Sequence, residues 1–150
     1  NAGISFTSAT VKCYIMAVES AANDNITSRL NVRIVNRGGN IVRATLLSIA
    51  DYSTATEWNT ALRNKAFADG DTVSGSYTTV DGDRLVIEIG HSDASGISIS
   101  GQIQVGEATG SDLAENETAT TGDPWIEFSN TITFQIEALK SNIINQSCII

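Results

Sequence analysis

The sequence predicts an all-β domain, an antiparallel β-sandwich or jelly roll of about eight strands. Apolar and polar residues alternate along several short segments, as in strands with one buried and one solvated face. Turn-forming stretches separate them, such as NRGGN at 36–40 and VDGD at 80–83. A chain of 150 residues can bury the core of one domain, and we assign residues 1–138 to it.

Each expected strand follows from this alternation. Residues 84–90 place Leu85, Ile87 and Ile89 on one face, which we expect to be buried. Residues 131–137, TITFQIE, place an isoleucine or phenylalanine at every second position. The same pattern or a weaker form of it predicts strands at 4–8, 11–19, 29–35, 41–49, 72–80 and 97–105.

Residues 54–70 depart from the alternation. Trp58, Leu62 and Ala66 recur at helical spacing, and a capping-box pattern, TATE, precedes them. This favours one short helix near 54–68, with a long connecting loop as the alternative.

Composition and charge exclude some classes of partner. The chain carries 17 acidic and 9 basic residues, a net charge of −8, with no basic stripe to follow a phosphate backbone. We therefore expect no binding to nucleic acid and none to an anionic membrane surface. No apolar run is long enough for a membrane span, and no secretory signal is visible. Because the chain begins with Asn1 rather than Met, we expect that a segment once preceded it.

The two cysteines, Cys13 and Cys148, allow two readings. A disulfide between them would tie the tail to the first strand. Two buried thiols are the favoured reading, because free cysteine is among the most buried residue types.

A long segment without periodicity spans residues 106–124 and is rich in Thr, Gly and acidic residues. Loops of this length tend to be functional or mobile. Pro124, the only proline, cannot donate to a strand ladder and marks the entry to a strand. After it, residues 139–150 form a tail that we expect to be an extra strand or an inter-subunit arm. We take five residues as candidates for binding a ligand or partner: Trp58, Asp112, Glu115, Glu117 and Trp125.

Two DGD turns place carboxylates two residues apart, which could suit Ca²⁺. The residues are Asp69, Asp71, Asp81 and Asp83. Asp-Gly is also a common hairpin turn, and that reading is favoured. We therefore expect no cofactor, with Ca²⁺ as the weaker alternative.

Two groups of residues raise enzyme hypotheses. His91, the only histidine, precedes Ser92 and Asp93, but these residue types are ordinary in turns and no nucleophile elbow is present. Glu88 and Glu127 could act as a glycosidase pair only if a cleft brought them within about 5–10 Å. Solvated acids are the favoured reading, and we expect no enzyme.

Two blocks carry a family resemblance. GDRLVIEIG at 82–90 and DPWIEFSNTITF at 123–134, in this order around an acidic loop, resemble β-sandwich proteins encoded among the structural genes of tailed bacteriophages. The resemblance implies a virion location and a non-enzymatic structural role, as a capsid decoration or cement protein. It further implies contacts with a major capsid or tail protein and a homo-oligomer, for which a trimer is one expected form. The alternative is a carbohydrate- or receptor-binding module of a tail or fibre.

Overall fold

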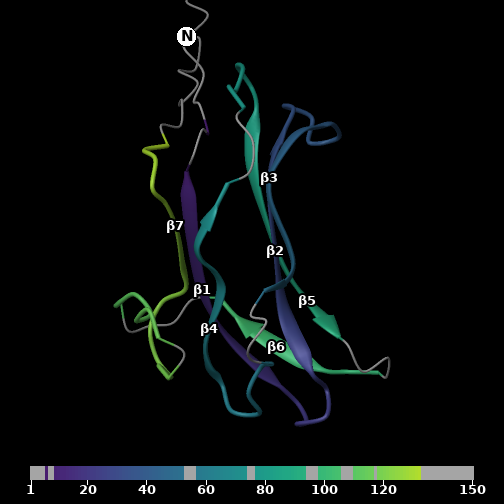
Figure 1. The fold of residues 1–150 in the computed structure, drawn as a ribbon, viewed down its shortest axis with the longest axis vertical. Helices are drawn as coiled ribbons and strands as arrows, with labels where there is room; N and C mark the ends of the chain where they lie inside the picture. Colours follow the sequence, from purple (N-terminus) through teal and green to yellow (C-terminus); the bar gives the residue numbers. More distant parts are fainter. Residues whose placement is uncertain are drawn as a thin grey trace, which may run out of the picture.

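Seven strands form two antiparallel sheets that pack face to face, as Figure 1 shows. The fold was obtained as a computed structural model, which describes residues 6, 9–52, 57–73, 77–93, 98–105, 110–116 and 118–132. No helix is present in these ranges, so the predicted β-sandwich is confirmed. None of the described residues therefore forms a helix that could cross a membrane.

The larger sheet is built around β1 (Thr10–Glu19). One edge of β1 pairs along its length with β4 (Arg63–Thr72). Its other edge is shared by two short strands, β6 (Gly101–Gln104) and β7 (Trp125–Phe128), which pair with different halves of β1. This strand is therefore the hub of the four-stranded sheet.

The smaller sheet has the order β3-β2-β5. Its central strand β2 (Ile26–Val35) pairs with β3 (Val42–Tyr52) on one side and with β5 (Arg84–Asp93) on the other. β5 and β3 are both edge strands among the described residues.

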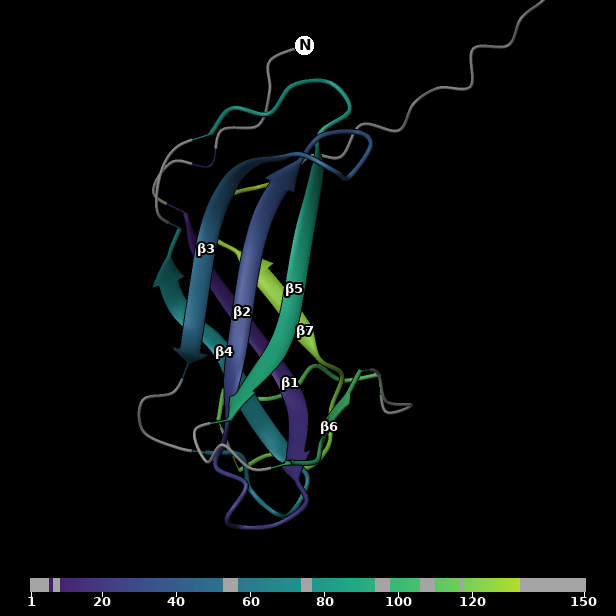
Figure 2. The same ribbon diagram turned by 90° about the vertical axis from the view of Figure 1, so that its right-hand side faces the viewer.

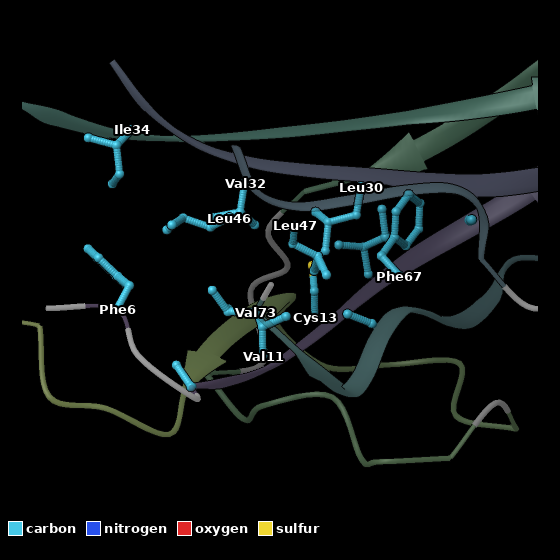
Figure 3. Close-up of a cluster of buried hydrophobic side chains, with 14 of the residues drawn as sticks. Phe6, Val11, Cys13, Leu30, Val32, Ile34, Leu46, Leu47, Phe67 and Val73 are labelled. Atoms are coloured by element: carbon cyan, nitrogen blue, oxygen red, sulfur yellow. The ribbon is translucent and has the colours of Figure 1, made fainter. Parts of the chain in front are cut away.

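The main core lies between the two sheets. Leu30, Val32 and Ile34 are buried on the inner face of β2, as their alternation with polar residues predicts. Figure 3 shows these side chains pointing toward Val11 and Cys13 of β1. Burial raises the pKa of the Cys13 thiol to about 12. Its alternative disulfide partner, Cys148, lies outside the described residues.

The helix predicted near 54–68 is wrong. Residues 57–62 are not helical, and β4 begins at Arg63. Five consecutive residues of β4, from Asn64 to Ala68, are buried because this strand is covered on both faces. Ala66 faces the outer cluster, whereas Phe67 and Ala68 face the main core, and the ladder with β1 shifts register between Ala66 and Ala68. A strand buried on both sides loses its alternation. Of the three residues at helical spacing, only Ala66 lies on β4, whereas Trp58 and Leu62 precede it, so the spacing did not belong to one element.

Other expectations are corrected at the strand ends. The strand expected at 72–80 is wrong, since β4 ends at Thr72 and residues 77–80 lie outside the named strands. The strand expected at 97–105 is reduced to β6. The strand at 84–90 is confirmed and continues to Asp93, but Ile87 and Ile89 are not buried. The strands predicted at 4–8 and 131–137 fall mainly outside the described residues, as does the tail at 139–150.

Candidate functional site

The long segment after β6 folds back over the outer face of the four-stranded sheet. Leu113, only 2% exposed, packs there against Tyr14 and Met16 of β1 and Ala66 of β4. These residues form a second, smaller core on the side of the sheet opposite to the main one. Figure 1 shows this segment beside β1 and β4, away from the smaller sheet. The part of the segment that the structure describes is therefore a packed layer.

Asn64 of β4 holds this layer in place. Its side chain is fully buried, and its Nδ2 donates to the carbonyl oxygens of Ala114 at 2.5 Å and Asn116 at 2.8 Å. Its backbone N–H donates to the carbonyl of Ala119 at 2.8 Å. One strand residue thus satisfies three carbonyls of a segment fifty or more positions away, while its own Oδ1 has no hydrogen-bond partner.

The two arms of the segment are joined by backbone hydrogen bonds. The N–H of Leu113 donates to the carbonyl of Asp123 at 3.0 Å, and the N–H of Asp123 donates to Ser111 at 2.6 Å. Gly122 makes this approach possible with a φ of 130°. A Cβ at this position would lie 2.9 Å from the Cα of Leu113, which no side chain tolerates without a shift.

Trp125 connects the layer to the sheet. Its indole stacks on Tyr14 with ring centroids 5.0 Å apart, and its Nε1 donates to the carbonyl of Leu113 at 2.8 Å. β7 starts at this residue, directly after Pro124, so the predicted strand entry is confirmed. The half-buried ring leaves one part at the surface.

A surface hollow of about 500 Å³ opens beside Trp125. It is lined by 112–115 of the segment and by 125–127 of β7. Three of the five predicted binding residues, Asp112, Glu115 and Trp125, therefore line the same hollow. Glu127 adds a third carboxylate to its wall. We call this feature the Trp125 hollow.

Lys12 is the cation beside this hollow. Its Nζ lies 2.6 Å from Glu115 and forms a hydrogen bond with it, which raises the lysine pKa against a smaller opposing effect of burial. In the β-ladders, Lys12 is paired with Asp69 on one side and Glu127 on the other, and both carboxylates raise its pKa further. Carboxylate oxygens around an indole can accept hydrogen bonds from hydroxyl or ammonium groups of a ligand.

The remaining binding candidates lie elsewhere. Trp58 is 1% exposed, and its Nε1 donates to Ser28 Oγ at 3.0 Å inside the main core. In this position it offers no surface to a ligand. Glu117 lies outside the described residues.

The two DGD turns belong to different sheets. Asp69 and Asp71 lie on β4, whereas Asp81 and Asp83 precede β5. Among the described residues, no three or more potential metal ligands of the His, Cys, Asp and Glu types gather in one place.

Asp83 has a structural role. Its Oδ2 accepts hydrogen bonds from the Tyr77 hydroxyl and the Val80 N–H, each at 3.0 Å, and its Oδ1 lies 2.7 Å from Arg43 Nε. Burial alone would raise the pKa of Asp83, but these three partners together outweigh it and lower the pKa. The carboxylate therefore fastens the turn before β5 to the start of β3.

The residues weighed for catalysis are also separated or packed. His91 contacts Trp58 edge to face, with ring centroids 5.9 Å apart. Glu88 pairs with Arg33 at 3.1 Å on the outer face of the smaller sheet. Glu127 is paired with Lys12 in the β1–β7 ladder and shares its place on the outer face of the larger sheet. The whole sandwich separates these two carboxylates.

Sequence reasoning missed three polar residues, of which Asn64 and Glu19 are buried and Lys12 is partly exposed. Asn64 and Lys12 act through partners on the distant 110–128 segment, so no local pattern indicates them. Glu19 is 2% exposed and accepts a hydrogen bond from the Ile26 N–H at 3.3 Å. Burial, and then the nearby Glu57 and Asp24, raise its pKa despite that hydrogen bond. Its position at the end of a strand resembles that of an ordinary solvated acid.

Comparison with protein-family models, with curated proteins and with solved structures found no match to this chain.

Proposed function

We propose that this chain is a non-enzymatic structural protein of a virion, a capsid decoration or cement protein that stabilises the particle through inter-subunit contacts. The observation that carries the proposal is an exposed apolar surface at one end of the smaller sheet. Ile41, Val42 and Val80 are 55%, 50% and 55% exposed there. We call this surface the apolar end.

The apolar end is held rigidly. The β2–β3 connection and the turn before β5 carry its residues, and the Arg43–Asp83 ion pair joins the two. Gly82 packs so closely that a Cβ there would lie 3.2 Å from Arg37 Cβ. Exposed apolar side chains gathered on fixed turns are typical of a protein contact surface.

The partner class follows from the sequence resemblance and the charge. A chain of net charge −8 suits a partner with a basic contact surface, such as a major capsid or tail protein. A homo-oligomer, of which a trimer is one form, would present several apolar ends at once. Residues 139–150 would serve as an inter-subunit arm.

The first test locates the protein. Mass spectrometry of purified particles of the encoding phage should detect the chain, and immunogold labelling should place it on the capsid shell. Absence from the purified particles would reject the proposal.

The second test addresses the contact itself. The double variant Ile41→Asp, Val80→Asp should bind particles lacking the protein about tenfold more weakly or worse, since a central apolar contact is lost. Val105→Asp is the matched control, because Val105 is 75% exposed but follows β6 in the other sheet. If the double variant and the control weaken binding equally, the apolar end is not part of the contact.

A second candidate function is a carbohydrate- or receptor-binding module, and the Trp125 hollow favours it. An indole beside three carboxylates can stack on a sugar ring and accept hydrogen bonds from its hydroxyl groups. Glycan-array binding, measured with and without a chelator, tests this alternative and any need for Ca²⁺.

The hollow can be altered without removing its support. Glu127→Gln and Asp112→Asn change the wall of the hollow, whereas Trp125→Ala also removes the stack on Tyr14. A glycan signal that falls in all three variants, but not in the control Glu88→Gln on the opposite face, would favour the alternative over the capsid role. An array without signal would leave the hollow as a structural feature.

A further inference from the structure

Two inward-facing side chains of β5 are left uncovered. Ile87 is paired with Val32 and Ile89 with Leu30 in the β2–β5 ladder. Directly paired residues of an antiparallel ladder point to the same face, so both isoleucines point between the sheets. Yet they are 36% and 37% exposed, whereas Val32 and Leu30 are fully buried.

The cause is an opening along one side of the sandwich. β4 lies against β2 and β3, so the β6 and β7 edge of the larger sheet lies on the same side as β5. Figure 2 shows β5, β6 and β7 on this side. β6 pairs with Met16–Glu19 and β7 with Val11–Tyr14, so neither of these strands pairs with Ile15. No described strand pairs with the free edge of β5.

The chain itself provides a segment of the right pattern at this place. The described residues end at Ile132, which packs against the same core as Leu85 at the start of β5. The next residues, TFQIE, continue with an apolar residue at every second position. A strand of this kind has one face for a core and one for solvent.

We propose that residues 131–137 dock along the free edge of β5 and close the sandwich. In the proposed arrangement Ile132 lies beside Leu85, and the segment runs parallel to β5 toward Ile89. Strands advance by similar distances per residue, so Phe134 would lie beside Ile87 and Ile136 beside Ile89. The smaller sheet then has four strands, and the exposed edge of β5 is paired.

This inference goes beyond the proposed function, since it concerns the isolated chain and does not require a particle. It also separates two parts of the C-terminal region. Residues 131–137 complete the domain, and only 139–150 remain as an arm.

Cysteine cross-linking in the full-length chain tests the placement. In a Cys148→Ser background, Ile87→Cys with Phe134→Cys should form a disulfide within one chain under mild oxidation. The matched control is Val86→Cys with Phe134→Cys, because one residue along a strand reverses the face. The first pair should close about tenfold faster or more, since only its two cysteines face each other. Ile89→Cys with Ile136→Cys repeats the test if the first pair alters folding.

The product distinguishes the occupants. A monomeric cross-linked chain with the expected preference supports the proposal. Disulfide-linked dimers would assign the free edge of β5 to a second copy and overturn the proposal. Equal rates for the test and control pairs, or no cross-link in any pair, would also overturn the proposal. Because the isolated chain is used, none of these results bears on whether the protein resides on a virion.

Discussion

Asn64 donates a side-chain hydrogen bond to the carbonyl oxygen of Asn116 at 2.8 Å, across the outer face of the four-stranded sheet. This contact joins a buried strand residue to a segment that covers it. The covering layer converts β1 and β4 into strands that are buried on both sides.

Asn64→Ala should destabilise the protein by about 1–3 kcal/mol, because it removes the buried donor that pairs with the carbonyls of Ala114 and Asn116. Urea denaturation measures this loss, and limited proteolysis should cut the variant faster within 110–120. Asn40→Ala removes only an exposed contact with Asn36 and serves as the control. Equal stability of the two variants would contradict the role of Asn64 as the clamp.

Gly122→Ala should cost roughly 1–3 kcal/mol, since a residue with φ of 130° and a Cβ 2.9 Å from Leu113 Cα is strained twice. Gly90→Ala is the matched control, because nothing lies within 4 Å of its added Cβ. Thermal unfolding should show a lower Tm only for the Gly122 variant. A similar Tm for both would mean that the two arms of the segment can separate without cost.

Asp83→Asn should destabilise by about 1–3 kcal/mol at neutral pH through loss of charge-assisted hydrogen bonds. The pKa of Asp83 is lowered in the folded state from its ordinary 3.8. Its contribution is therefore complete above pH 3.8 and is lost as the pH falls through the lower folded-state pKa. Denaturation curves from pH 2 to 7 should converge for the parent and variant at the acid end. Parallel curves would contradict this assignment.

Glu19→Gln should have the opposite sign. Burial raises the pKa of Glu19 above its ordinary 4.5, so the folded chain binds more protons between 4.5 and the folded-state pKa. Stability from this group therefore falls as the pH rises through that window, and the cost is complete above it. The glutamine can still accept the Ile26 N–H bond without carrying a charge. We expect the variant to be more stable than the parent at pH 7 and equal to it below pH 4.

Cys13 should react with a thiol reagent only when the protein opens. Burial raises its pKa to about 12, so almost no thiolate is present at neutral pH. In a Cys148→Ser background, the folded chain should react about a hundredfold slower or more than the chain in denaturant. The wild-type chain in denaturant should show two reactive thiols. If it shows no reactive thiol, Cys13 and Cys148 form a disulfide instead.

The fold class was predictable because alternation reports directly on a two-layer sheet structure. β2 shows this best, with Leu30, Val32 and Ile34 buried and Arg29 exposed. β4 could not be predicted in the same way, because its outer cover comes from residues 110–119. A local pattern cannot reveal a covering segment that lies fifty positions later in the chain.

The candidate site was predictable only in part, because residue type indicates chemistry but not exposure. The residue types of Trp125, Asp112 and Glu115 within an irregular segment predict a binding role, and the structure brings the three to one hollow. Trp58 was selected on the same grounds but lies in the core, since an isolated tryptophan carries no information about its exposure. Ile87 and Ile89 show the opposite error: their alternation predicts burial, but both are exposed, because burial of a strand face depends on what lies opposite it.

The central position of β1 also has a consequence for biosynthesis. The N–H of Thr10 donates to Ser129 Oγ, 119 residues away, and β6 and β7 also pair with β1 from distant positions in the sequence, β7 from the farther ones. The first strand to leave the ribosome therefore waits for the last described one before its sheet is complete. Such long-range pairing slows folding, since the loop must close before the contacts form. In the interval, Tyr14 and Met16 have no cover, so the nascent chain is at its most prone to aggregation just before residues 110–128 emerge.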